Sequence, residues 1–137
     1  MNNECLFDEI ISTYTRAQAI EDGVLIDASG TGETAALLRE ISRSHFKYPI
    51  AMTEAVFELI QQAVDHPKHC NDWKGVWHDI LWMAKVDSTR QEIDPTTVVF
   101  TVIITGVGRS RYKRLKFVCG PNDDGSPCLT LMLPSES

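Results

Sequence analysis

The stretch from Thr97 to Leu133, TVVFTVIITGVGRSRYKRLKFVCGPNDDGSPCLTLML, decides the fold of this chain. Its apolar segments are rich in β-branched and aromatic side chains, which is typical of strands. Gly106 and Gly108 separate the first segment from the second, and a Gly-, Pro- and Asp-rich turn separates the second from the third. The three expected strands are residues 98–104, 115–119 and 128–133. This pattern predicts a three-stranded antiparallel meander.

Three to four helices are expected ahead of these strands. Thr15 and Thr53 are typical N-cap residues, and Gly23 is a typical helix stop. The expected helices are residues 16–22, 33–42, 54–65 and 73–86, with a short strand candidate at 24–27. The fold class is therefore α+β, with helices packed against one face of the meander. We expect a single domain over residues 1–137, with a helical part at about 15–86, a linker at about 87–96 and antiparallel strands at about 97–133.

Helical spacing separates inward from outward side chains on two of these helices. On the helix at 33–42, the expected inward residues are Leu37, Leu38 and Ile41. On the helix at 73–86, the expected core residues are Trp73, Trp77, Ile80, Leu81 and Ala84. Trp82 lies about 180° from Trp73 on the same helical wheel. Trp82 must therefore either meet a second layer of structure or be exposed.

Charge is unevenly distributed along the chain, whose net charge is −6. Residues 1–108 hold 8 Lys and Arg against 16 Asp and Glu, a net charge of −8, whereas residues 109–137 hold 5 against 3, a net charge of +2. An acidic body disfavours non-specific binding to nucleic acid. No apolar run approaches the roughly 18 residues of a membrane span, and the first residues are acidic where a signal peptide is basic. We therefore expect a cytoplasmic protein with no membrane association.

Motifs for cofactors and metals are weak. The loop Gly30-Thr31-Gly32 precedes a helix but lacks the lysine of a P-loop, so we expect a turn there. The four cysteines contain no C-x-x-C pair; Cys119 and Cys128 flank the last turn and are expected to be small buried side chains. The cluster of potential metal ligands, with no familiar zinc spacing, is His66, His69, Cys70 and His78. We predict no metal and no cofactor.

Catalysis has equally little support. His78 and Asp79 supply an imidazole and a carboxylate, but neighbouring helical residues point about 100° apart. No nucleophile in a recognisable turn accompanies them. We therefore expect that the protein is not an enzyme, with His78 and Asp79 the only residues worth testing if it is.

The strongest binding candidate is the basic segment between the first two predicted strands. Along a strand, Arg114 and Lys116 would share one face, and Tyr112 is the one aromatic ring among the cations. The same pattern also fits an ordinary half-exposed strand. We take as candidate partner-binding residues Arg109, Arg111, Tyr112, Lys113, Arg114, Lys116 and Trp82.

Several stretches, in order along most of the chain, carry a family resemblance. They are residues 14–27 (YTRAQAIEDGVLID), 48–53 (YPIAMT), 77–84 (WHDILWMA), 115–121 (LKFVCGP) and 131–134 (LMLP). Together they resemble a family of short bacterial proteins of unknown function, mostly encoded on plasmids, integrative elements and phages. The resemblance implies an accessory role on a mobile element and transfers no catalytic residue. It also implies that residues 30–44 are a local elaboration.

The leading functional hypothesis is a non-enzymatic binding protein of a mobile genetic element. Its partner would be a host or mobile-element protein, and inhibition of a host defence system, as by an anti-CRISPR protein, fits a small acidic chain. The first alternative is a nucleic-acid-binding module that uses the basic hairpin at 109–116. The second alternative is an uncharacterised enzyme.

Overall fold

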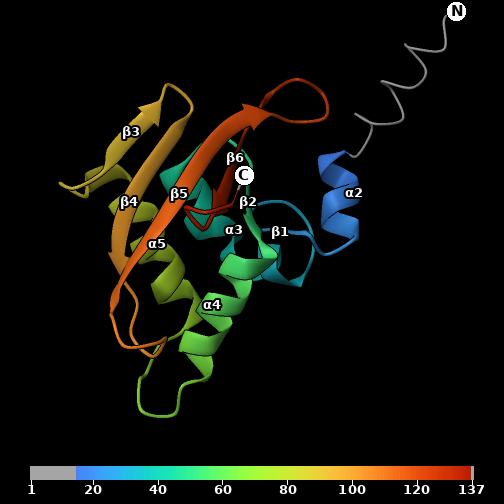
Figure 1. Cartoon of the computed structure of the whole chain (residues 1–137). Helices are drawn as coiled ribbons and strands as arrows, with labels where there is room; N and C mark the ends of the chain where they lie inside the picture. The colour runs from blue at the N-terminus through green and yellow to red at the C-terminus, as the bar shows by residue number, and fades with distance from the viewer. Residues whose placement is uncertain (1–14, 137) are drawn as a thin grey trace, which may run out of the picture.

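A mixed six-stranded β-sheet forms the centre of the structure, a computed structural model that describes residues 15–136 (Figure 1). Its strands are β1 (Leu25–Asp27), β2 (Ile50–Thr53), β3 (Gln91–Asp94), β4 (Thr97–Ile103), β5 (Tyr112–Pro121) and β6 (Pro127–Met132). The helices of the described residues are α2 (Arg16–Glu21), α3 (Glu33–His45), α4 (Glu54–Asp65) and α5 (Trp73–Val86). The fold class is therefore α+β.

The strands lie side by side in the order β1-β2-β6-β5-β4-β3. Strands β4, β5 and β6 pair antiparallel as consecutive neighbours, so the C-terminal meander is present as one half of the sheet. The sheet is larger than the predicted three-stranded meander, because β3 extends it on one side and β2 and β1 extend it on the other. Strand β2 runs parallel to β6, which makes the sheet mixed (Figure 1).

Strand β3 overturns the expected linker at residues 87–96. Residues Gln91–Asp94 form a hairpin with β4 through a tight turn in which the Asp94 carboxylate accepts hydrogen bonds from the N–H and the hydroxyl of Thr96. Every residue of β3 is exposed, because it is the edge strand of the sheet. A polar strand of this kind lacks the apolar alternation by which strands are recognised in a sequence.

Strand β2 lies in the segment that we expected to be helical. It holds only four residues, and Ile50, Ala51 and Met52 are buried because β1 and β6 flank the strand on both sides. A short apolar run without alternation cannot be distinguished from a piece of buried helix by its pattern. The side chain of Thr53 then accepts a hydrogen bond from the N–H of Val56, so β2 passes directly into α4.

The helix boundaries follow the capping residues closely. The predicted spans of α4 and α5 are confirmed, and Thr15 forms a full capping box with Gln18 at the start of α2. Gly23 follows α2 with a φ of +79°, a backbone conformation that favours glycine. Helix α3 runs to His45 rather than to Ser42, because no glycine or proline follows Ser42 to end it. The expectation that Leu37 faces the core is wrong, since 42% of it is exposed.

The hydrophobic core lies between one face of the sheet and helices α3, α4 and α5. Its largest fully buried side chain is Trp77, as expected from the face of α5. The indole Nε1 of Trp77 donates to the hydroxyl of Ser42 on α3, and that hydroxyl donates to the backbone carbonyl of Ala28. This buried chain of hydrogen bonds ties α5 to α3 and to the end of β1.

The two cysteines beside the last turn lie on opposite faces of the sheet. Cys119 is opposite Leu129 and packs against the core, whereas Cys128 is opposite Gly120 on the other face. Successive strand residues alternate between faces, so this register keeps the two thiols apart. Burial raises the pKa of the Cys128 thiol, which makes it less reactive at neutral pH. Within residues 15–136, no helix combines the length and the apolar character that a membrane span requires.

Candidate functional site

A groove of about 460 Å³ lies between α5 and the part of β4 that β3 does not cover. Its walls are Asp79, Trp82, Met83, Asp87, Thr89, Thr101, Val102, Ile103 and Tyr112. Three of these residues are large hydrophobic residues that stay exposed: Trp82 by 48%, Ile103 by 54% and Tyr112 by 58%. Single exposed apolar residues are ordinary, but several around one concavity mark a binding surface.

Local structure explains why these three side chains meet. Ile103 and Tyr112 are register partners at the end of the β4–β5 hairpin, so they share one face of the sheet. Trp82 points away from the Trp77 side of α5, as the helical wheel predicts, and it is exposed. The groove therefore combines Trp82 and Tyr112, two of the candidate residues taken from the sequence.

The Trp82 ring has two contacts outside the groove. The ring of His45 lies 6.4 Å from it, edge-on, and the Lys85 ammonium lies 5.5 Å from its centroid. Burial, followed by the charges of Lys85 and His78, lowers the pKa of His45, which favours the neutral imidazole at neutral pH. An aromatic side chain held in this way loses little conformational entropy on binding.

Asp87 closes one end of the groove. Its carboxylate accepts hydrogen bonds from the Thr101 N–H at 2.8 Å, from the Thr89 hydroxyl at 2.7 Å and from the Thr89 N–H at 3.2 Å. Burial opposes ionisation of this carboxyl group, but the three hydrogen bonds and the nearby Arg114 outweigh burial and lower its pKa. The ionised Asp87 carboxylate thus accepts the hydrogen bond that the Thr101 N–H would otherwise donate to a neighbouring strand.

Replacing Asp87 by an uncharged residue is expected to make the free energy of unfolding depend less on pH in the acid range. The pKa of Asp87 is lower in the folded chain than in the unfolded chain, where it is about 3.9, so ionised Asp87 stabilises the fold above that pH. This stabilisation is lost as the pH falls through the folded-state pKa. Asp87→Asn should therefore lower the free energy of unfolding by about 1–2 kcal/mol at pH 7, with a difference that shrinks below about pH 4. Urea denaturation between pH 3 and pH 7 measures both quantities. A difference that stays constant over this range would contradict the role given to the Asp87 charge.

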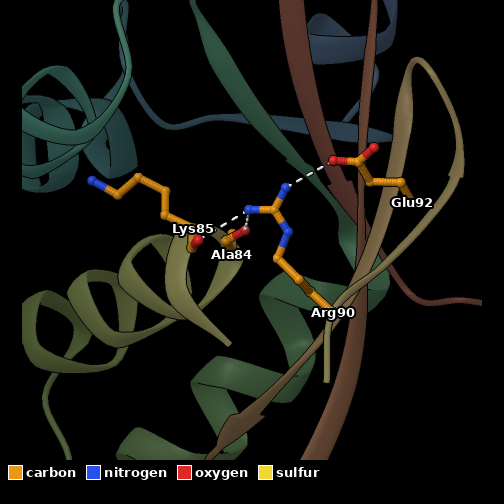
Figure 2. A network of polar contacts seen from close by, with 4 residues as sticks. All are labelled: Ala84, Lys85, Arg90 and Glu92. Carbon is orange, nitrogen blue, oxygen red and sulfur yellow. Dashed lines mark hydrogen bonds and ion pairs between the residues drawn. The ribbon is translucent and has the colours of Figure 1, made fainter. Parts of the chain in front are cut away.

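Arg90 links the end of α5 to β3, as Figure 2 shows. Its guanidinium donates to the carbonyl of Lys85 at 2.9 Å and to that of Ala84 at 3.5 Å, and it pairs with the Glu92 carboxylate at 3.0 Å. These carbonyls belong to the last turn of the helix, where backbone acceptors lack helical partners. Arg90 thereby joins the end of α5 to the strand that covers the first half of β4.

The cations of the basic segment fall into two groups: those whose side chains donate hydrogen bonds to other parts of the fold (engaged cations), and those whose side chains do not within residues 15–136 (unengaged cations). Arg114 donates to Thr101 and Gln91, the Lys113 ammonium donates to the Val107 carbonyl at 2.5 Å, and the Lys116 ammonium donates to the Glu136 carbonyl. The exposed guanidinium of Arg111 lies 5.4 Å from the Tyr112 ring centroid, a cation–π distance. The side chains of Arg109 and Arg111 make no hydrogen bond or ion pair within residues 15–136. The structure thus brings Arg111, Tyr112 and Trp82 to one region, engages Lys113, Arg114 and Lys116 in hydrogen bonds, and leaves Arg109 exposed outside both groups.

The remaining sequence candidates have structural roles or stand apart. The Asp27 carboxylate accepts from the N–H groups of Ser29, Gly30 and Thr31, so these amides are already occupied. In the part of the chain that the structure describes, no three His, Cys, Asp or Glu side chains gather as a metal site would require. His78 and Asp79 approach to 3.6 Å between Nδ1 and Oδ1, which is beyond hydrogen-bond length, and both are well exposed.

A second pocket, of about 340 Å³, adjoins α2. Two of its polar side chains are engaged by the fold itself: Arg16 donates to Leu129 and Thr130, and the Asp123 carboxylate accepts the N–H groups of Arg16 and Ala17. These contacts hold α2 against the sheet. The α2 side of this pocket therefore has a structural explanation, whereas the three exposed hydrophobic residues of the groove beside Trp82 have none.

Sequence reasoning missed Met83, Asp87, Thr101 and Ile103 as parts of the site. Strand alternation carried a signal for Ile103, because Phe100 and Val102 face the core and Ile103 must then face away from it. Helical spacing likewise places Met83 next to Trp82 on α5. Asp87 carried no comparable signal, since its partner Thr101 lies fourteen residues away on another element.

The comparisons with known proteins identify the family. A model described as "Family of unknown function (DUF6573)" matches residues 1–137, so the chain belongs to this family. No curated protein and no solved structure matches the chain significantly.

Proposed function

We propose that this family member is a non-enzymatic binding protein that captures a partner protein in the groove between α5 and β4. The observation that carries the proposal is the meeting of Trp82, Ile103 and Tyr112, all about half exposed, around one concave surface of about 460 Å³. Aromatic side chains in pockets supply most of the binding energy at protein interfaces. The partner is a host protein or a protein of the element that encodes the chain.

The charges around the groove support a protein partner. Arg111 stands at the Tyr112 side, and Asp79 stands at the Trp82 side. Charges of both signs around an apolar centre match the rim of a typical protein interface. A binding site for nucleic acid would instead present cations along its length.

The proposed setting is a mobile genetic element in a bacterial cytoplasm, where the protein inhibits a host defence system in the manner of an anti-CRISPR protein. The resemblance of the sequence to proteins encoded on plasmids, integrative elements and phages supports the setting. The net charge of −6 supports binding to a basic protein surface, such as that of a nuclease, because opposite charge accelerates association.

Nucleic-acid binding is the second candidate, favoured by the unengaged Arg109 and Arg111. An enzymatic role for His78 and Asp79 ranks third. Nucleic-acid binding predicts an electrophoretic mobility shift that weakens steeply with salt and is lost in Arg109→Glu/Arg111→Glu. Protein capture predicts no mobility shift with nucleic acid alone. The presence or absence of this shift therefore separates the first two candidates.

Trp82→Ala is expected to abolish capture of the partner. Loss of a buried aromatic anchor costs at least about 2 kcal/mol of binding free energy, which is roughly a thirtyfold loss of affinity. The measurement is quantitative mass spectrometry of proteins recovered from a bacterial lysate, together with photo-crosslinking from a benzoylphenylalanine placed at Tyr112. Leu37→Ala, which shortens an exposed apolar side chain on α3, is the matched control. Capture that survives Trp82→Ala, or that is lost equally in Leu37→Ala, would contradict binding in the groove.

A further inference from the structure

Strand β3 covers only half of the outer edge of β4. The pairing runs from Asp94 opposite Thr97 to Gln91 opposite Val99 and stops there. In the described chain no strand lies beside Thr101 or Ile103 on this side. The uncovered edge borders the groove, since Thr101, Val102 and Ile103 line it.

The backbone direction of the uncovered residues follows from their pairing with β5. The N–H of Ile104 donates to the Arg111 carbonyl, so Ile104 and its even-numbered neighbours direct their backbone groups toward β5. Thr101 and Ile103 therefore direct theirs outward, and the Thr101 N–H is indeed bound by the Asp87 carboxylate. The N–H and carbonyl of Ile103 face the groove with no strand opposite them.

The side chains beside this edge come from both sides of the sheet. Trp82 and Met83 belong to α5, which packs on the core face. Ile103 and Tyr112 point to the opposite face. A strand added at the edge would alternate its own side chains between these two apolar walls. A helix could not use the backbone groups of Ile103, because its own amides are bonded internally.

We infer that the groove binds an extended peptide segment of the partner, which adds a strand to the free edge of β4. This inference rests on the proposed function and deepens it. The segment places an apolar side chain against Trp82 and Met83, and its neighbours in sequence point to the Ile103 and Tyr112 side. An acidic residue there complements Arg111, which has no ion pair within the described residues. Backbone pairing supplies affinity, and the two walls supply specificity.

The test uses displayed random octapeptides selected against the full chain. Enriched sequences are expected to carry apolar residues at both alternating sets of positions and to include an acidic position. A synthetic peptide of the best sequence is then N-methylated at one residue at a time, and its affinity is measured by fluorescence anisotropy. N-methylation at edge-facing residues should weaken binding by about tenfold or more, whereas methylation of the residues between them should be tolerated, giving a period of two.

Protein variants separate this inference from the broader proposal. Trp82→Ala should abolish peptide binding, Arg111→Glu should weaken it for acidic peptides, and Leu37→Ala should leave it unchanged. If Trp82→Ala abolishes peptide binding but N-methylation is tolerated equally along the whole peptide, the peptide binds in the groove without adding a strand, and the inference is overturned. Peptide binding that is indifferent to Trp82→Ala, or the selection of no peptide, would overturn the inference, while the lysate experiment decides the proposed function independently.

Discussion

Ser42→Ala is expected to lower the free energy of unfolding by about 2–4 kcal/mol. The Ser42 hydroxyl is fully buried, accepts the Trp77 indole N–H at 2.9 Å and donates to the Ala28 carbonyl at 2.8 Å. Alanine removes both interactions and leaves a donor and an acceptor buried without partners. Each such group costs roughly 1–3 kcal/mol, which is far more than the loss of one exposed hydrogen bond.

The measurement is urea denaturation of the two variants Ser42→Ala and Ser44→Ala. Ser44 is the matched control because its hydroxyl donates to the Ile41 carbonyl at an exposed position of the same helix. A second control is Ser42→Ala made in the Trp77→Phe variant, which lacks the indole donor. The loss of unfolding free energy caused by Ser42→Ala should be smaller in this variant. Equal costs in the two backgrounds would show that the indole hydrogen bond does not stabilise the fold.

Phe100→Ala is expected to be the most damaging change in the C-terminal strands, at about 3–5 kcal/mol. The Phe100 ring is fully buried, lies opposite Leu115 in the β4–β5 pair and stacks on Phe117 with 6.0 Å between ring centroids. Truncation leaves a cavity at the contact between the sheet and α5. For a domain of this size the melting temperature should fall by roughly 10–20 °C.

Ile103→Ala is the control for this prediction, because Ile103 lies on the same strand but is about half exposed. Ile103→Ala should lower the free energy of unfolding by less than about 1 kcal/mol, because the Ile103 side chain buries little apolar surface on folding. Calorimetry or thermal denaturation monitored by circular dichroism compares the two variants. If Ile103→Ala were as costly as Phe100→Ala, the groove would be part of the core and not a free surface.

The core and the groove share α5, and this links stability to the proposed binding. Trp77 anchors the helix to the core, while Trp82, five residues later, stands at the groove. Positions five apart on a helix differ by about 140° in direction, so one helix can supply both. Arg90 and Asp87 hold the end of this helix and the uncovered part of β4 in place. The binding surface is thus built on rigid elements.

Local signals in the sequence were sufficient for most elements. Thr15 and Thr53 mark helix starts through side chains that accept from backbone N–H groups within the next turn. Alternation predicted that Arg114 and Lys116 share one face of the strand, and the structure buries Leu115 and Phe117 on the other face. The basic segment was predicted less well, because Arg114, Lys113 and Lys116 bind groups on the hairpin and the C-terminal turn that spacing alone cannot identify.

By itself, the sequence determined where helices α4 and α5 begin and end, where the three C-terminal strands lie, and that Trp82 points away from the Trp77 side of its helix. Those features depend on interactions between residues a few positions apart. Only the tertiary structure decided that β2 joins β6 in parallel, that polar Gln91–Asp94 is a strand, and that Trp82, Ile103 and Tyr112 surround one groove. The physical reason is that strand pairing depends on which backbone groups remain free after the whole chain has packed. The half-covered edge of β4 exists because β3 begins only at Gln91, opposite Val99, and Asp87 binds Thr101.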